Sequence, residues 1–270
     1  MTVKLTTNEK IAFTSSKGNQ EKWREKGLWY KLDQFGYEAL TETFTSKLLE
    51  YSNIEAQTPF TFVRYDMTKV KVRGIERVAC VSNNFLKKNQ SVITLSTLFN
   101  KIYSVPFKKK LSALPSDKKR IKYIADAATE FTGLNDFDKY LTVLFEIDSL
   151  ILNDDRHLNN IAIIEENGKY SYCPIFDNGA GLLSNMQLLR TDIEPSGLIK
   201  SLTASPFNMT FNRELNTTRA LFGKVLSIPY FSKRELRIIL EPLLEYYPQR
   251  DRGVILDRVT ECIVQRQKHI

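Results

Sequence analysis

Apolar residues follow one pattern in the first third of the chain and another in the rest. Short runs rich in β-branched and aromatic residues predict strands over 11–13, 27–32, 60–65 and 77–81. Residues 37–51 carry leucine and phenylalanine at helical spacing, which predicts one helix among these strands. Residues 1–90 are therefore expected to form a small β-rich lobe with one helix.

The remainder of the chain has a mainly helical pattern, which extends beyond Gly181 to the last residues. Helices are expected over 91–103, 121–131, 136–152, 232–246 and 253–267. The helix over 136–152 is apolar on nearly every face, which is typical of a buried central helix. We therefore predict an α+β protein of two lobes, in which residues 91–270 form the larger, mainly helical lobe.

A polar loop separates this apolar helix from an apolar hairpin. Residues 153–160 read Asn-Asp-Asp-Arg-His-Leu-Asn-Asn. Apolar runs over 161–164 and 170–176 follow the loop and flank Asn167-Gly168. An Asn-Gly pair between two such runs is a strong local signal for a β-hairpin.

Three side chains with oxygen atoms are expected to meet at one end of the hairpin. Asp155 and Asn160 lie in the loop before it, and Asp177 follows its second strand. Phosphoryl transfer uses such a corner, because one carboxylate orients or deprotonates the acceptor hydroxyl while other oxygens hold Mg²⁺ on the ATP phosphates. The structural alternative is that these Asp residues cap a turn and close a hairpin. A purely structural connection would not need so polar a loop, which favours the chemical interpretation.

The positive charge of the chain is concentrated in one stretch. There are 39 Lys and Arg against 31 Asp and Glu, which gives a net charge of +8. Between Lys101 and Lys122, eight basic residues stand against one acidic residue, so this stretch carries +7. With Pro106 and Pro115 it is expected to be a solvated connection, or else a positive rim near the site. Because the rest of the chain is nearly neutral, we do not expect direct nucleic-acid binding.

The cysteine and histidine content excludes several kinds of site. Three widely separated Cys residues in apolar surroundings indicate buried thiols and an intracellular, cytoplasmic protein rather than a disulfide framework. Two His residues are too few for a His-rich or Cys-His zinc site. A signal-peptide pattern and a membrane-spanning apolar run are both absent from the sequence. The available chemistry is therefore that of carboxylates, Lys, Asn and hydroxyl groups.

Two motifs resemble the catalytic segments of a known kinase superfamily. The run Asp155-Arg156-His157-Leu158-Asn159-Asn160 matches the Asp-Arg-His-x-x-Asn loop of phosphoinositide kinases and their protein-kinase relatives. Phe176-Asp177-Asn178-Gly179 stands where their Asp-Phe-Gly segment would. Over residues 15–183, with a Trp-Tyr-Lys strand and a Gly-Tyr-Glu helix, the chain resembles the HipA-like serine/threonine kinases of bacteria. The resemblance implies a protein-kinase-like fold and an ATP- and Mg²⁺-dependent serine/threonine protein kinase.

The resemblance also implies roles for individual residues. Asp155 would be the catalytic base, and Asn160 and Asp177 would be the Mg²⁺ ligands. Lys31 would contact the ATP phosphates. Glu42 would pair with Lys31, and Glu38, one turn earlier, is its rival because residues four apart are neighbours on a helix. The alternative is an exposed helix face for both Glu residues.

The same comparison places a phosphate-covering loop near the start of the chain. Ser15, Ser16, Lys17 and Gly18 would form it, and either Ser is a hypothetical site of autophosphorylation. His157 is expected near the nucleotide, as a hydrogen-bonding residue that shapes the catalytic loop. Arg156 is expected to position that loop or a phosphate.

Further implications concern partners and regulation. The expected partners are a protein substrate with a Ser or Thr acceptor and, since HipA proteins are toxins, an antitoxin protein. Asn178 replaces the Phe of Asp-Phe-Gly, which removes an apolar anchor used in the regulation of protein kinases. Two other functions stay open: a lipid or small-molecule kinase of the phosphoinositide-kinase type, and a catalytically inactive nucleotide-binding module.

Overall fold

The N-terminal part of the described chain, through Asn83, forms an antiparallel four-stranded sheet. The computed structural model describes residues 20–103 and 107–270. The strands are β1 (Lys22–Glu25), β2 (Leu28–Leu32), β3 (Asp66–Val72) and β4 (Ile75–Asn83), in the order β1-β2-β4-β3. Both hairpins close on a residue followed by Gly, Lys26-Gly27 and Arg73-Gly74, with left-handed φ at both positions. Such turns match the twist of the flanking strands and favour Gly at the second position.

One predicted strand is wrong. Residues 60–65 are not part of the sheet, and the strand before β4 begins at Asp66. Phe62 forms an isolated parallel bridge with Ile175, and Val63 N–H donates to the Ile175 carbonyl over 2.9 Å. The aromatic run therefore hydrogen-bonds to the chain just before Asp177. It links the N-terminal sheet region to the predicted site.

A second, three-stranded sheet lies beside the first helices of the C-terminal part. It contains β5 (Ser91–Thr94), β6 (Ala162–Glu166) and β7 (Lys169–Tyr172) in that order. The predicted Asn167-Gly168 hairpin is confirmed, because Glu166 pairs with Lys169 across it. The helix expected over 91–103 is partly wrong: its first four residues form β5, and α4 (Leu95–Ile102) follows.

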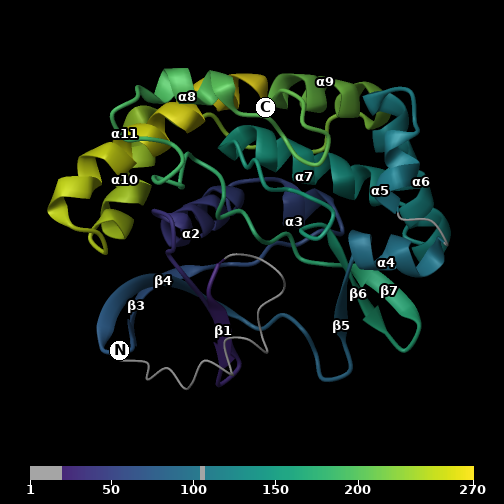
Figure 1. Cartoon of the computed structure of the whole chain (residues 1–270), viewed down its shortest axis with the longest axis horizontal. Helices are drawn as coiled ribbons and strands as arrows, with labels where there is room; N and C mark the ends of the chain where they lie inside the picture. The colour runs from purple at the N-terminus through teal and green to yellow at the C-terminus, as the bar shows by residue number, and fades with distance from the viewer. Residues whose placement is uncertain (1–19, 104–106) are drawn as a thin grey trace.

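The helices fill the space above the two sheets (Figure 1). They are α2 (Glu38–Leu49), α3 (Ile54–Gln57), α5 (Phe107–Ser112), α6 (Asp117–Thr132), α7 (Phe137–Ile151), α8 (Pro195–Ser201), α9 (Phe211–Phe222), α10 (Lys233–Leu244), α11 (Gln249–Arg266) and the short 3₁₀ turn η1 (Gln267–His269). The predictions for α7, α10 and α11 are confirmed within a few residues. The helical pattern expected directly after Gly181 is wrong, because residues 182–194 contain no helix. The basic stretch is not a plain connection, since it contains α5 and the first turns of α6.

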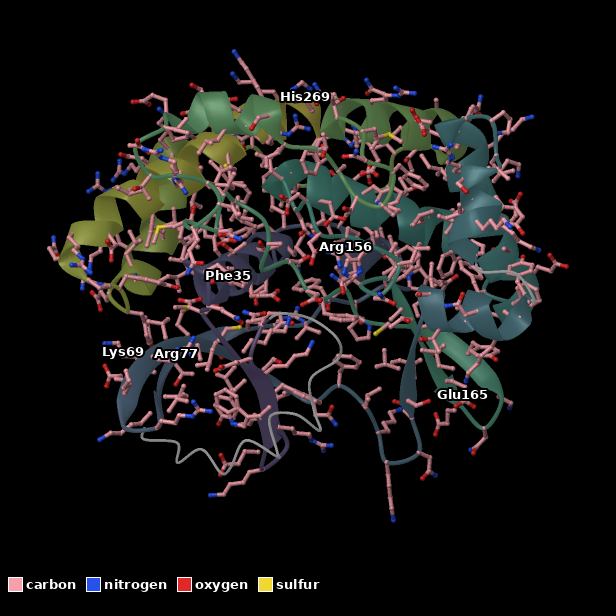
Figure 2. The ribbon with its side chains drawn as sticks, viewed as in Figure 1. Phe35, Lys69, Arg77, Arg156, Glu165 and His269 are labelled. Carbon is pink, nitrogen blue, oxygen red and sulfur yellow. The ribbon has the colours of Figure 1, made fainter. Side chains whose placement is uncertain are left out.

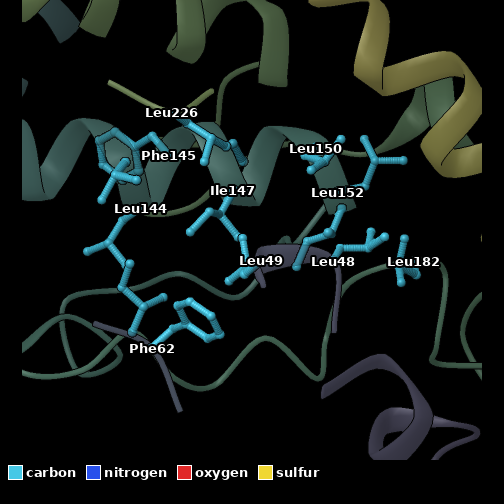
Figure 3. Close-up of a cluster of buried hydrophobic side chains, with 14 of the residues drawn as sticks. Leu48, Leu49, Phe62, Leu144, Phe145, Ile147, Leu150, Leu152, Leu182 and Leu226 are labelled. Atoms are coloured by element: carbon cyan, nitrogen blue, oxygen red, sulfur yellow. The ribbon is translucent and has the colours of Figure 1, made fainter. Parts of the chain in front are cut away.

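The main apolar core surrounds α7 and α2. Leu144 and Ile147 of α7 lie in one buried cluster with Leu48 and Leu49 of α2 (Figure 3). All but two residues of α7 are buried, as expected of a central helix. In the part of the chain that the structure describes, each helix is too short or too polar to cross a membrane. The α+β architecture, a β-rich N-terminal part and a mainly helical C-terminal part, agrees with the prediction.

Candidate functional site

The site begins where α7 ends. The helix stops at Leu152, which takes a left-handed φ of 57° and turns the chain into the polar loop. The loop is fixed at its far end by α4, since the Ser96 and Leu95 N–H groups donate to the Leu158 and Ile161 carbonyls. The loop then enters β6, and after the hairpin the chain reaches Asp177. Asp177 has a φ of 63°, a conformation that Asp tolerates better than most residues.

Arg156 holds the loop and the Asp177 segment together. Its guanidinium is fully buried and binds both carboxylate oxygens of Asp148 on α7, with Nε 2.9 Å from Oδ2 and Nη2 3.0 Å from Oδ1. The remaining N–H groups donate to the Asn160 and Phe176 carbonyls and to Asn178 Oδ1, over 3.1, 2.7 and 2.7 Å. Figure 2 shows Arg156 among the side chains in the middle of the molecule. Of the two roles expected for Arg156, the structure supports the positioning of the loop.

Lys31, Glu42 and Asp177 form a second cluster of opposite charges. Lys31 Nζ lies 2.6 Å from Glu42 Oε1 and 2.7 Å from Asp177 Oδ1. Burial alone would lower the pKa of Lys31, but the Asp177 and Glu42 carboxylates outweigh it and hold this pKa well above its usual value. Burial would likewise raise the pKa of Asp177, yet Lys31, followed by Lys22, holds it below the usual value of a carboxyl group. Both partners are therefore charged at neutral pH.

Glu42 rather than Glu38 pairs with Lys31. The second carboxylate oxygen of Glu42 accepts the Asn178 N–H over 2.9 Å, so this side chain also fixes the residue after Asp177. Glu38 instead accepts the N–H groups of Gln34, Phe35 and Gly36, just before its own helix. Both Glu side chains are buried, so the exposed helix face considered from the sequence is wrong.

The chain after Asp177 is hydrogen-bonded to the segment that leads into α2. Tyr37 N–H donates to the Ser184 carbonyl over 3.2 Å, and Met186 N–H donates to the Phe35 carbonyl over 3.0 Å. A side chain at Gly36 would place its Cβ 1.9 Å from the Ser184 carbonyl oxygen, so this close approach requires Gly. Tyr37 adds a third bond, from its hydroxyl to the Leu182 carbonyl over 2.6 Å.

Asp155 presents its carboxylate to solvent, with 59% of its side chain exposed. Asn160 closes the loop behind it, because its Nδ2 donates to the Asp155 carbonyl over 2.8 Å. His157 Nδ1 accepts the Asn159 N–H, and its Nε2 lies 3.6 Å from Asp155 Oδ1. Partial desolvation raises the pKa of Asp155, the neighbouring His157 opposes this shift, and the Asp177 charge adds to it. The loop thus holds an exposed carboxylate within electrostatic range of Asp177.

The donor set suits a cation that is shared with a phosphorylated ligand. Among the residues described, no three His, Cys, Asp or Glu side chains cluster as a cage for a metal ion. Mg²⁺ in phosphoryl-transfer sites typically takes only one or two carboxylates, together with phosphate oxygens and water. Asp177, fixed by Lys31, and Asn160, fixed through Arg156, fit that requirement.

Sequence reasoning missed three residues of the site. Lys22 on β1 lies directly opposite Lys31 on β2, which puts both side chains on one face of the sheet. Burial lowers the pKa of Lys22, while the Asp177 charge opposes this shift. Asp148 and Asn178 are the other two, both partners of Arg156. The signal for Asp148 was available, since an acidic residue inside an apolar helix needs a buried partner.

The predicted phosphate loop is not tested by the structure. Ser15, Ser16, Lys17 and Gly18 lie outside the described residues.

Comparisons with known proteins identify the fold. No protein-family model matches the chain, and no curated protein matches its sequence. The proinflammatory kinase CtkA of Helicobacter pylori has a similar structure, with a TM-score of 0.59 and 14% identity over 96% of this chain and 90% of that one. A second match, with a TM-score of 0.51 and 11% identity, is the toxin–antitoxin complex of HipA, HipB and operator DNA from Shewanella oneidensis MR-1.

The second alignment covers 93% of this chain and 64% of the matched chain. The chain therefore has a kinase-like fold that resembles those of CtkA and HipA, which confirms the predicted fold class.

Proposed function

We propose that the protein is an ATP- and Mg²⁺-dependent serine/threonine protein kinase of the HipA-like type. The observation that carries this proposal is the convergence of Lys31, Glu42 and Asp177 beside the loop of Asp155 and Asn160. The kinase-like fold supports it, since a matched structure of that fold is a kinase. An inactive nucleotide-binding module is disfavoured, since no charged group of the expected set is replaced.

Lys31 binds the nucleotide phosphates in this proposal. Its ammonium is paired with the carboxylates of Glu42 and Asp177, so these three groups carry a net charge of −1 before ATP and Mg²⁺ arrive. Glu42 keeps the Lys31 side chain in place while the phosphates share its remaining donor capacity. Lys22, on the same face of the sheet, supplies a second cation toward them.

Asp177 and Asn160 would hold Mg²⁺, which screens the phosphate charge and orients the γ-phosphoryl group when bound. Asp155 accepts the proton of the acceptor Ser or Thr hydroxyl. The hydroxyl oxygen then forms the new bond to phosphorus as the bond to the ADP oxygen breaks. A raised pKa suits Asp155 for this task, because a base with a pKa nearer the working pH retains the proton better.

The test is phosphate transfer from labelled ATP with Mg²⁺, to the protein itself, to a generic protein substrate and to phosphatidylinositol vesicles. We expect Asp155→Asn to lower transfer by about 10²-fold or more, as the loss of a general base does. Asp126→Asn is the matched control, since Asp126 is 57% exposed on the surface of α6 and lies outside the site. Equal transfer by the wild-type protein and Asp155→Asn would overturn the assignment, and label in lipid alone would favour a lipid kinase.

Two further parts of the proposal concern regulation and partners. Autophosphorylation at Ser15 or Ser16 is tested by phosphopeptide mapping after incubation with ATP, and an unmodified peptide containing both residues would contradict it. A matched solved structure contains HipA with HipB and operator DNA, which supports an antitoxin protein as a candidate partner of this cytoplasmic kinase.

A further inference from the structure

The basic stretch runs from the end of α4 through α5 to the first turns of α6, three helices that lie together at one end of the molecule (Figure 1). Lys101, Lys109, Lys118 and Lys119 are exposed, and none of them has an ion-pair partner among the described residues. We refer to these four residues as the basic face. Exposed lysines without partners are open to an external anion.

The acidic residues nearby do not neutralise the basic face. Asp117 binds Arg120 over 3.0 Å and Arg213 of α9 over 2.6 Å. Asp126 binds Lys122 over 2.9 Å. Asp117 and Asp126 are thus matched by other cations, and Glu130, which is exposed and forms no ion pair in the described chain, is the one acid of α6 left to oppose the four lysines. The surface potential here is positive after internal pairs are counted.

A stack of aromatic rings holds the helices of the basic face in place. The rings of Phe99 on α4 and Phe107 on α5 stack with centroids 3.9 Å apart, and Phe107 lies 5.8 Å from the ring of Tyr123 on α6. Lys110 Nζ covers the ring of Tyr103 at 3.5 Å. The stacked rings therefore hold α4, α5 and α6, which carry the lysines, in fixed positions. One face of the Tyr103 ring is covered by Lys110.

The basic face is joined directly to the catalytic loop. α4 begins with backbone hydrogen bonds to Leu158 and Ile161, and Lys101 lies six residues further along it. At about 1.5 Å per residue, this separation is about 9 Å along the helix axis. An extended peptide covers about 3.3 Å per residue, so about three residues would span from this end of the loop to Lys101, the lysine of the basic face on α4.

The chemistry of the face favours an acidic protein segment over other polyanions. Membrane-surface binding usually adds apolar insertion, but no exposed large apolar side chain of the described residues belongs to α4, α5 or α6. Single-stranded nucleic acid usually stacks on open aromatic faces, and here the Tyr103 ring is partly covered by Lys110. Separate lysine point charges suit flexible carboxylate side chains.

We propose that the basic face docks an acidic segment of the protein acceptor, a few residues away from the Ser or Thr that enters the site. This inference rests on the proposed kinase function, since it assigns a substrate class to the same site. Acceptors with an acidic stretch on one side of the hydroxyl would then be preferred over neutral ones.

The test compares two labelled peptides that share one Ser acceptor and differ in a tail of about six Glu or six Gln residues, a length of about 20 Å. Fluorescence anisotropy measures the affinity of the full chain for each peptide, and kinetics measure transfer. One variant carries Lys101→Gln, Lys109→Gln, Lys118→Gln and Lys119→Gln. A control variant carries Lys71→Gln, Lys169→Gln, Lys233→Gln and Lys268→Gln, four exposed lysines elsewhere without an ion pair in the described chain.

We expect the Glu peptide to bind about tenfold more tightly than the Gln peptide, and the preference to weaken with salt. The basic-face variant should lose the preference through KM while kcat is retained, and the control should keep it. Equal affinity for both peptides, or equal loss in both variants, would overturn docking. Tighter binding of a single-stranded RNA or of phosphatidylserine vesicles, lost in the basic-face variant, would also overturn it in favour of that partner.

The two proposals fail differently in this experiment. Binding of the Glu peptide through the basic face without any phosphate transfer would contradict the kinase function and leave the docking surface supported. Equal transfer to both peptides would contradict the docking surface and leave the kinase function supported. ATP binding, measured on every variant, reports whether the nucleotide site is intact.

Discussion

Two clusters of opposite charges lie close together, one around Arg156 and one around Lys31 with Asp177, and they differ in how far solvent reaches them. The Arg156–Asp148 pair is 0% and 1% exposed, and each nitrogen of the Arg156 guanidinium donates within the protein. In the Lys31 cluster, Lys31 is 10% and Asp177 is 24% exposed. In the first cluster, every guanidinium nitrogen already donates within the protein, so none is left to bind a ligand. The second cluster is partly exposed to solvent.

Residues that hold the loop in place and residues that are available for chemistry are therefore neighbours in the sequence. Asp155, Arg156 and His157 are consecutive, yet only Arg156 turns inward while its neighbours face solvent. A closed ion pair fixes backbone positions, because removal of one partner leaves an uncompensated buried charge. An open cluster can exchange an internal partner for a phosphate or a metal ion. The predictions below test whether the clusters divide stability and activity in this way.

The largest expected effect is on stability, from Arg156→Met. This change leaves Asp148 buried without its partner and should lower the free energy of unfolding by about 3–5 kcal/mol. Urea denaturation measures the loss. The double variant Arg156→Met with Asp148→Leu should recover part of it, and Lys122→Met, which breaks an exposed pair, should cost less than about 1 kcal/mol. A single-variant loss as small as that of Lys122→Met would contradict the scaffold role.

The next effect is on activity, from Asp177→Asn. Glu42 still neutralises Lys31, and Asn tolerates the left-handed φ of this position, so the unfolding free energy should fall by less than in Arg156→Met. Phosphate transfer should fall by about 10²–10³-fold, as it does when one transition-state contact is removed. Transfer from labelled ATP and urea denaturation of the same sample give both values. If Asp177→Asn retained phosphate transfer, or unfolded at the same urea concentration as Arg156→Met, the proposed distinction between the two clusters would be wrong.

A third prediction concerns Asp33, a carboxylate held by neutral donors. It accepts the Ala39 N–H over 2.6 Å and the Tyr247 hydroxyl over 2.7 Å. Burial raises the pKa of Asp33 to about 8, against the hydrogen bonds that lower it. Between its unfolded pKa, about 4, and pH 8 the folded protein binds more protons at this site than the unfolded chain, so stability falls as pH rises.

We expect the wild-type protein to lose about 2 kcal/mol relative to Asp33→Asn between pH 5 and pH 7. Urea denaturation of both proteins at the two pH values measures this difference. The contributions of titratable groups that the two proteins share cancel in the comparison. Parallel curves would show that Asp33 is ionised in the folded protein. Asp177, whose pKa is held below the usual value by Lys31, should contribute no such loss over this range.

The smallest expected effect comes from Lys22→Gln. Lys22 lies beside the open cluster without forming its core, so this change should raise the Kd for ATP about fivefold, about 1 kcal/mol. Titration with a fluorescent ATP analogue measures it. Lys71→Gln, on the opposite edge strand of the same sheet and close to the β3–β4 turn, should leave the Kd unchanged. An unchanged Kd in Lys22→Gln would limit phosphate contact to Lys31.

Local signals in the sequence predicted the elements that carry the site. The Asn167-Gly168 pair closes its hairpin as expected, and the apolar run of α7 ends at the polar loop. The family resemblance implied that Glu42 pairs with Lys31, helix spacing left Glu38 as its rival, and the fold distinguishes the two. These features depend on residues that are near one another in sequence, or on motifs that are contiguous.

What sequence reasoning missed depends on contacts between distant residues. Phe60 to Tyr65 has strand-forming residues, but its backbone partner is Ile175, more than a hundred residues away. β3 reads Asp-Met-Thr-Lys-Val-Lys-Val and alternates apolar and polar residues only over Val70 to Val72, so its strand signal is weaker than that of the apolar run before it. The environment of Arg156 also required the fold, because Asn178 reaches it only after the hairpin has formed.

The hydrogen bonds between residues 35–37 and the Leu182–Met186 segment have a consequence for control. Any swing of α2 away from Lys31 would have to break three backbone-directed bonds and the packing around Gly36 at the same time. These bonds therefore favour the arrangement in which Glu42 and Lys31 are paired, and separating the two side chains would cost free energy. We therefore expect inhibition of such a protein to act by blocking access to the site rather than by moving α2 away from Lys31.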